Sequence, residues 1–130
     1  MAGTLPDEEA QEFSRELALR RQRRLVQLAA LYVEERQEYR TTVTEICQAL
    51  GVGRRTLEYA FRDVVGTSPR AYFIQCALEA AHHKLQASNP ADRTVTEVAT
   101  EFGFWHLGRF SVSYRIAFGE TPSETLRALA

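Results

Sequence analysis

An internal repeat constrains the fold of this 130-residue chain more than any other feature. The string Thr-Val-Thr-Glu at residues 42–45 returns at residues 94–97, an offset of 52. After one inserted residue the match continues at an offset of 53: Leu57, Phe61, Gly66 and Pro69 align with Phe110, Tyr114, Gly119 and Pro122. A repeat of this length usually marks one supersecondary unit that is used twice. The sequence therefore predicts two copies of one small fold.

Each copy has the pattern of two helices joined by a short turn. Thr42 and Thr94 are favourable N-cap residues, and a glutamate three residues after each completes a capping box. Gly51 and Gly103 follow the first, short amphipathic helix, where glycine can adopt the positive φ of a helix end. After three to four residues a second helix starts, and it is expected to end just before the aligned glycines of the repeat.

Helices are expected outside the two copies as well. Pro69 occupies the favoured first position of a helix that runs to about Gln86, and Pro122 opens the last helix. Residues 7–36 form either one long helix or two abutting ones. An apolar stripe on them closes the first copy: Leu25, Leu28, Ala29, Tyr32 and Val33. The arginine-rich run at residues 20–24 is expected to be a solvated face, with phosphate contact as the rarer alternative.

The predicted fold class is all-α, with two tandem helix-turn-helix subdomains joined by a long linker helix, because the sequence lacks β alternation. We place unit one at residues 25–68, the linker helix at 69–88 and unit two at 94–130. Together they form a dual helix-turn-helix domain over residues 25–130. Residues 1–24 are expected to be a helical extension.

The second helix of each unit combines an apolar stripe with an opposite outer face. In unit one the stripe has helical spacing: Leu57, Ala60, Phe61, Val64 and Val65. Four residues with the same spacing form its outer face: Arg55, Glu58, Tyr59 and Arg62. Adding 53 gives the outer face of unit two: Gly108, Ser111, Val112 and Arg115. The stripe of unit two is Phe110, Tyr114, Ala117 and Phe118. The two outer faces are therefore matched position for position.

The residue types on these faces suit the major groove of double-stranded DNA. Arg55 can donate two hydrogen bonds to guanine, and Glu58 can accept one from cytosine N4. Ser111 can bond to several bases, and Val112 can pack on the methyl group of thymine. The sequence therefore predicts that both second helices read bases.

Other residues are expected to allow close approach or to contact phosphates. Gly108 has no side chain and lets the start of its helix come near the DNA, while Arg109 beside it supplies a contact. The predicted phosphate partners are arginines, a histidine and the threonines at helix starts: Arg54, Arg62, Arg115, His106, Thr42 and Thr94. A linker helix of about 17 residues spans roughly 25 Å. The two reading helices are thus expected to reach major-groove segments about 34 Å apart, an asymmetric monomeric footprint without a palindrome.

Charge is the strongest argument against DNA binding. The formal net charge is −1, whereas dedicated DNA binders are usually basic. From residue 40 onward there are ten Lys or Arg and nine Asp or Glu (10 − 9 = +1), so affinity must come from a few well-placed arginines. Two alternatives stay open. The same faces could serve a helical protein-interaction module, or an architectural DNA binder without base preference.

The sequence argues against an enzyme or a metal site. His82 and His83 are adjacent on a helix and point about 100° apart, unlike metal ligands at i and i+4. No cysteine or carboxylate cluster accompanies His106, so neither a cofactor nor a catalytic residue is predicted. Trp105 is expected to anchor unit two as a turn residue rather than to stack on a cofactor.

Cysteine usage and hydropathy indicate the compartment. Cys47 and Cys76 lie in helix-like apolar patterns, where they are expected to be small, reduced core residues rather than a disulfide framework. No stretch approaches the ~18 consecutive apolar residues of a membrane span. Residues 1–6 lack the pattern of a signal peptide. We therefore expect a cytoplasmic protein without a membrane partner.

Short motifs occur in both units and in the helix between them. Unit one and the helix start carry Ala49-Leu50-Gly51-Val52, Arg55-Thr56-Leu57, Phe61, Gly66, Ser68-Pro69 and Tyr72. The linker helix has Leu78-Glu79-Ala80-Ala81-His82. Unit two has Val98-Ala99, Gly103-Phe104, Arg109-Phe110, Tyr114-Arg115, Phe118-Gly119 and Pro122-Ser123. Over residues 25–130 this set resembles the C-terminal DNA-binding domain of the AraC/XylS family of bacterial transcriptional regulators. The string Gly-Phe-Trp-His-Leu-Gly at 103–108 is similar to the ethanolamine-regulator branch.

The resemblance implies sequence-specific promoter binding and contact with RNA polymerase, usually as an activator. The family pattern puts base-reading positions on both second helices: Arg55, Glu58, Tyr59, Leu107, Gly108, Arg109, Ser111 and Val112. Gly53 departs from this pattern, because the family usually has a serine cap there. Most members also carry an N-terminal sensing and dimerisation domain, and without one this chain is expected to be a monomer.

Overall fold

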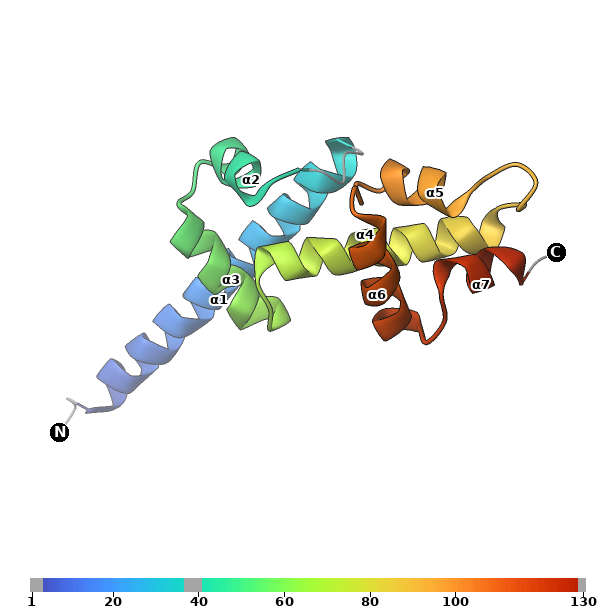
Figure 1. Cartoon of the computed structure of the whole chain (residues 1–130). Helices are drawn as coiled ribbons and strands as arrows, with labels where there is room; N and C mark the ends of the chain where they lie inside the picture. The colour runs from blue at the N-terminus through green and yellow to red at the C-terminus, as the bar shows by residue number, and fades with distance from the viewer. Residues whose placement is uncertain (1–3, 37–40, 129–130) are drawn as a thin grey trace. The chain divides into compact units, whose positions relative to one another are not determined.

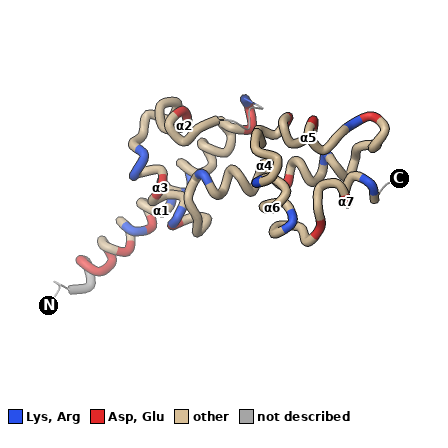
Figure 2. Tube along the Cα trace, in the orientation of Figure 1, with Lys and Arg blue, Asp and Glu red and all other residues tan. Residues whose placement is uncertain are grey.

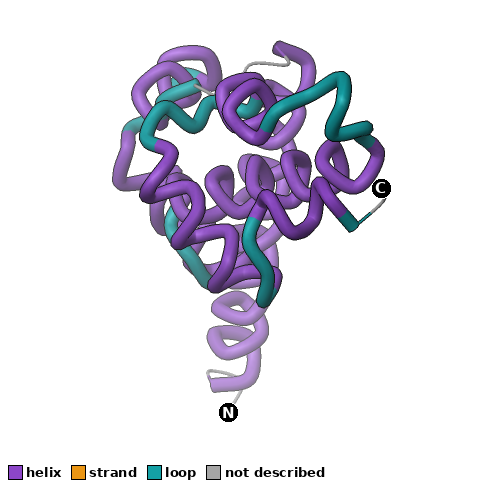
Figure 3. The backbone as a smooth tube through the Cα atoms, turned by 45° about the vertical axis from the view of Figure 1, so that its right-hand side comes forward, coloured by secondary structure: helices purple, strands orange, loops and turns teal. Residues whose placement is uncertain are grey.

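A computed structural model describes residues 4–36 and 41–128 of the chain. These residues form seven helices (Figure 1): α1 (Thr4–Arg36), α2 (Val43–Leu50), α3 (Arg54–Val65), α4 (Pro69–Ala87), α5 (Val95–Glu101), α6 (Leu107–Phe118) and α7 (Pro122–Arg127). The described ranges contain no strand, and the connections between the helices are short (Figure 3). The all-α prediction is confirmed.

The helices belong to two compact units. One comprises the described residues up to Arg36 and from Thr41 to Arg70, and therefore holds α1, α2 and α3. The other begins at Ala71 and holds most of α4 together with α5, α6 and α7. From here on, unit one and unit two denote these two sets of residues, which also include the beginning of α1 and most of the linker helix, respectively. The helix expected from Pro69 is α4, and it ends at Ala87.

The core of unit one lies where α1, α2 and α3 contact one another. Its buried apolar side chains come from all three helices: Val26, Ala29, Ile46, Cys47, Leu57, Ala60 and Phe61. At the edge of this core, the side-chain amide of Gln22 donates a hydrogen bond of 2.7 Å to the Asp63 carboxylate. These contacts join the middle of α1 to α3.

The long first helix extends beyond the core. α1 is one continuous helix of 33 residues, so the alternative of two abutting helices is excluded. Residues 7–16 are all exposed, and acidic residues predominate among them (Figure 2). The four arginines of the run at 20–24 are exposed as well, as expected of a solvated face.

Two predicted core residues of unit one are exposed. Leu28 is 37% exposed, because the buried stripe of α1 is centred on Val26 and Ala29 and leaves Leu28 on the flank. Val65 is also 37% exposed, because it is the last residue of α3 and stands next to the terminating Gly66. Val64, one position earlier, is half-buried.

Unit two packs α5, α6 and α7 around the second half of α4. Eight buried residues form one cluster: Leu78, Ala81, Leu85, Val98, Ala99, Phe110, Tyr114 and Leu126. Ala117, predicted in the stripe of α6, is exposed. In the last turn of α6 the contact with α4 is made instead by Phe118, whose ring stacks on His82 with centroids 4.1 Å apart.

The predicted helix ends are observed in both units. The Thr42 hydroxyl accepts from the Glu45 N–H at 3.1 Å, and the Glu45 side chain completes the capping box. The Thr94 hydroxyl accepts from the Glu97 N–H at the same distance, but the Glu97 carboxylate pairs with Arg93 at 3.7 Å instead of completing the predicted capping box. Gly51 has φ +68°, the left-handed conformation in which glycine ends a helix without strain. Prolines open α4 and α7 as expected.

Candidate nucleic-acid interface

The outer face of α3 is uncovered. Leu57 and Phe61 on the inner face are fully buried, so the opposite face must point away from unit one. Arg55 and Arg62 are exposed there, and Tyr59 is 56% exposed. The fourth predicted residue, Glu58, is partly covered, because it pairs with another predicted site residue.

That partner is Arg54, one turn earlier on α3. The Arg54 Nε lies 3.2 Å from Glu58 Oε1, in an ion pair with both side chains partly exposed. The pair offsets the negative charge of Glu58 on a face proposed to meet a polyanion. Arg54 keeps its remaining guanidinium N–H groups for a phosphate, since Arg has five donors. Both predicted roles are compatible with this arrangement.

The start of α3 has no side-chain cap. Gly53 is the N-cap residue, with an extended backbone (φ −76°, ψ 157°) and no capping side chain. The missing cap agrees with the sequence analysis, in which Gly53 replaces the serine that the resembled family usually has at this position.

The outer face of α6 is also uncovered, but its chemistry differs. Phe110 and Tyr114 are buried, while the side that faces away carries four exposed predicted residues: Gly108, Arg109, Val112 and Arg115. Leu107 precedes Phe110 by three residues and so lies on the side of the buried stripe, but as the first residue of α6 it is still 38% exposed. Ser111 is half-buried on the flank of this face. The sequence of α6 contains no Asp or Glu, so its charged side chains are both positive.

His106 has a structural role that sequence reasoning missed. It is the N-cap of α6, and its Nδ1 accepts from the Arg109 N–H at 3.2 Å. A neutral ring that accepts at Nδ1 carries its proton on Nε2, which leaves a donor for a phosphate. A Cβ at Gly108 would lie 3.4 Å from the His106 Cε1 atom, an ordinary van der Waals contact, so the cap by itself does not require glycine at this position.

Two large apolar side chains near α6 were misjudged or missed. Trp105 is 66% exposed and does not anchor unit two. Phe102 and Phe104 do so instead, because they pack against the core, with the Phe104 ring 4.8 Å from Phe110. Ile116 is 81% exposed on the outer face of α6. Ile116 is four residues after Val112 and therefore lies on the same side of α6, which was a usable sequence signal for its exposure. The prediction left it out because its counterpart in unit one, Asp63, is not among the residues of the predicted outer face.

The predicted phosphate partners at the first helices are exposed. Thr42 and Thr94 use a lone pair of the hydroxyl to cap α2 and α5. Each hydroxyl still has its hydrogen, which can be donated to a phosphate oxygen.

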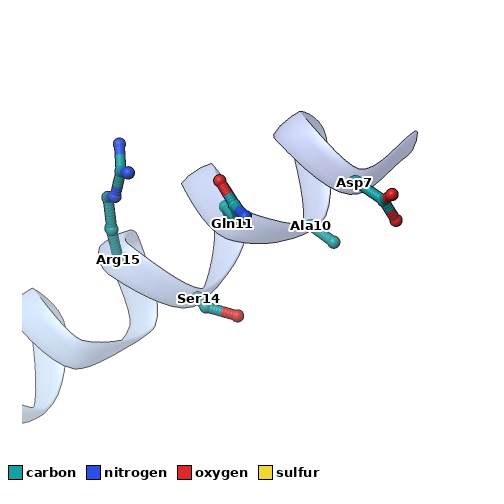
Figure 4. A pocket seen from close by; sticks show the side chains of 5 residues that line it. All are labelled: Asp7, Ala10, Gln11, Ser14 and Arg15. Carbon is teal, nitrogen blue, oxygen red and sulfur yellow. The ribbon is translucent and has the colours of Figure 1, made fainter. Parts of the chain in front are cut away.

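Other candidate sites are weaker. A hollow lined by Asp7, Ala10, Gln11, Ser14 and Arg15 lies along one exposed stretch of α1 and is open to solvent (Figure 4). Among the described residues, no three His, Cys, Asp or Glu side chains are grouped to hold a metal ion. Cys47 is buried and Cys76 half-buried, and both are free thiols. No helix in the described ranges has the length and hydropathy needed to cross a membrane.

Comparison with known proteins places this arrangement in a family. The sequence model of a family described as "Helix-turn-helix domain" matches residues 46–128. The "Probable thc operon regulatory protein" of Rhodococcus erythropolis is 35% identical over 105 residues, which are 81% of this chain and 32% of that protein. The "XylDLEGF operon transcriptional activator 1" of Pseudomonas putida is 35% identical over 96 residues, 74% of this chain and 29% of that protein. The chain thus spans about a third of the length of these relatives.

A solved structure is similar as well. It is a crystal structure of a transcriptional regulator from Chromobacterium violaceum, described among "AraC-type DNA-binding domain-containing proteins". The sequences are 27% identical, the TM-score is 0.73, and the match covers 83% of this chain and 94% of the other. Both units therefore have a fold already known from a DNA-binding domain.

Proposed function

Because this chain belongs to the AraC/XylS family of helix-turn-helix transcriptional regulators, we propose that it regulates transcription by reading promoter DNA with α3 and α6. Each of these helices is the second helix of its unit and would lie in the major groove, as recognition helices do. The observation that carries the proposal is the same in both units. One face of the helix is fully buried, and the opposite face is uncovered and carries arginines.

Base reading is assigned to the outer faces. Arg55 suits guanine, and Glu58 suits the amino group of cytosine. Tyr59 adds an exposed ring with a hydroxyl group on the same face. In unit two the proposed readers surround a helix start that glycine keeps open: Leu107, Gly108, Arg109, Ser111 and Val112.

Phosphate contacts fix the position of each unit without reading sequence. In unit one we assign them to Thr42, Arg54 and Arg62, and in unit two to Thr94, His106 and Arg115. All six residues are exposed. Because the chain has a net charge of −1, these few contacts must supply most of the sequence-independent affinity.

The finer role follows from the family and from the names of the relatives. We propose that the protein activates transcription, as the name of the Pseudomonas putida relative says of that protein, and that it contacts RNA polymerase. We propose further that it acts in the cytoplasm, catalyses no reaction, and binds as a monomer to a non-palindromic site.

Selection of bound sequences from a random pool of double-stranded DNA tests the proposal. We expect one enriched, non-palindromic motif. Arg55→Ala should then lose about 1–3 kcal/mol of discrimination at one base pair, and Ser111→Ala should relax a different position. Arg127→Ala serves as the control, because it removes an exposed arginine outside both reading faces.

Two outcomes would contradict the assignment. If Arg55→Ala weakens binding to all sequences alike, the protein is an architectural binder. If binding does not weaken linearly with the logarithm of the salt concentration, the outer faces serve a protein partner instead, since each phosphate contact contributes a slope of about 0.9.

A further inference from the structure

The most exposed line of α6 is apolar. Val112 is 62% exposed and Ile116 is 81% exposed. They are four residues apart and therefore neighbours on one side of the helix, opposite the buried Phe110 and Tyr114. Exposed apolar side chains are common on protein surfaces, but this pair lies on the face of α6 that the proposed function turns toward DNA, where it is available for a contact with the bases.

The surroundings of the pair indicate the chemistry of that partner. Arg109 and Arg115 are exposed on the same side of α6, and neither guanidinium has an ion-pair partner in the described part of the chain. No carboxylate is present in α6. Apolar side chains flanked by two free cations complement a surface that combines apolar groups with negative charge. The major groove offers this combination where thymine methyl groups lie between phosphates.

Unit one lacks this feature. The aligned positions, 53 residues earlier, are Tyr59 and Asp63. Tyr59 has a polar hydroxyl, and the Asp63 carboxylate accepts a hydrogen bond from Gln22. The apolar pair is therefore specific to α6, and the two helices differ in the chemistry that they present.

We propose that α6 recognises thymines through their C5-methyl groups, with Val112 and Ile116 as the contacting side chains. The inference rests on the proposed function, because it assumes that α6 lies in the major groove. Four residues at 1.5 Å each separate the two side chains by about 6 Å along the helix. This is near two base-pair steps of about 3.4 Å, so the pair can contact two thymines that are close together. α3 instead reads by hydrogen bonds from Arg55 and Glu58.

Replacement of thymidine by deoxyuridine isolates the effect of the C5-methyl group, because the two nucleosides differ in that group alone. We would replace each thymine of the selected site in turn and measure binding at fixed salt by fluorescence anisotropy. When one of the contacted thymidines is replaced, the affinity of the natural protein should fall about fourfold. This loss is equivalent to ~0.8 kcal/mol, the value for burial of one aliphatic carbon with its hydrogens. We expect it at one or two positions of the site.

Variants connect the effect to the two side chains. Val112→Ala and Ile116→Ala should bring the ratio of thymine to deoxyuridine affinity close to one at their respective bases. Both residues are exposed, so neither change disturbs the core, and far-UV circular dichroism verifies the fold. Ile74→Ala is the matched control, since Ile74 is 39% exposed on α4 and should leave the ratio unchanged.

The outcomes separate this inference from the proposed function. Selective binding with a ratio near one at every thymine, or a preferred site without thymine, overturns methyl recognition and leaves promoter reading intact. If the preference for thymidine over deoxyuridine persists in both alanine variants, other residues contact the methyl group. That outcome also overturns the proposed role of Val112 and Ile116. Failure to select any preferred sequence overturns the proposed function itself.

Discussion

Gly53 and His106 occupy equivalent places at the starts of the two reading helices but stabilise them differently. His106 accepts a hydrogen bond from the third residue of α6. Gly53 has no side chain to do this for α3, although its carbonyl accepts from the Leu57 N–H at 3.2 Å. A reading helix with Arg54 and Arg55 in its first turn thus begins without a cap.

Gly53→Ser should stabilise unit one. The backbone at Gly53 is extended, a conformation that serine adopts readily, and a new Cβ would meet no atom within 4 Å. The hydroxyl can accept from a first-turn N–H, and the unfolded chain loses conformational freedom. Together these effects are worth about 1 kcal/mol, measurable by urea unfolding.

Gly53→Ala provides the comparison for this prediction. Alanine restricts the unfolded chain in the same way but is a poor N-cap. Serine should therefore exceed alanine in stability, and equal stability of the two variants would refute the capping explanation.

The helices of unit two are joined through a single hydroxyl. Tyr114 of α6 donates to the Thr125 hydroxyl of α7 at 2.8 Å, and Thr125 in turn donates to the Glu120 carboxylate. The same Tyr114 oxygen lies 2.6 Å from His82 Nδ1 on α4. Because the phenol has only one hydrogen to donate, His82 must be the donor in that contact. One aromatic residue therefore links α4, α6 and α7.

Tyr114→Phe should destabilise unit two by about 1–3 kcal/mol, because it removes the acceptor of the His82 N–H and the donor to the buried Thr125 oxygen. The ring itself is retained, so packing is preserved. Urea unfolding followed by circular dichroism measures the loss. Tyr59→Phe removes a hydroxyl from an exposed tyrosine and should cost almost nothing. A similar loss in both variants would contradict the role of the network.

Stability at alkaline pH should also depend on Tyr114. Burial raises the pKa of this phenol, a hydrogen bond to Thr125 opposes the shift, and the nearby Glu120 carboxylate adds to it. The folded state therefore favours the neutral phenol. As the pH rises above about 10, the unfolded chain loses its proton first, and the free energy of unfolding falls. Since Tyr114→Phe lacks this titration, the stability difference from the natural protein should be constant up to about pH 9 and should narrow as the pH rises above about 10. A constant difference would contradict the shift.

Helix ends were predictable from sequence because their determinants are local. The Thr42 hydroxyl bonds three residues away, and Gly51 terminates the helix next to it. The exposure of Trp105 was not predictable in this way, because it depends on which parts of unit two cover its side chain. Phe104 rather than Trp105 meets Phe110, and only the packed structure distinguishes these two aromatic neighbours. The outer faces were predictable because helical periodicity separates them from the buried stripe.

Charge is distributed unevenly along the whole molecule. Residues 1–16 contain five Asp or Glu and one Arg (1 − 5 = −4), so residues 17–130 carry a net charge of +3 (−1 + 4). The acidic side chains lie on the exposed beginning of α1. The net charge of the whole chain is close to zero because an acidic extension offsets a cationic domain, so the total is a weaker argument against DNA binding than it first appeared. Affinity for a polyanion should be reduced by this extension.

Replacement of Glu8, Glu9, Glu12 and Glu16 by glutamine tests the effect of the extension on binding. The net charge changes from −1 to +3 (−1 + 4), while the helix and the core are unchanged because all four residues are exposed. Affinity for every DNA sequence should rise severalfold at low salt, and base preference should stay the same. The gain should shrink as salt shortens the Debye length from about 30 Å at 0.01 M to about 8 Å at 0.15 M.

Arg15→Gln is the matched change of opposite sign in the same exposed stretch of α1, and it should weaken binding slightly under the same low-salt conditions. Opposite shifts in the two variants identify a long-range charge effect, because neither variant alters a proposed DNA contact. If the glutamine variant instead gained affinity for only some sequences, the extension would have to contact DNA directly. An unchanged affinity at low salt would show that the acidic segment lies too far from bound DNA to act on it.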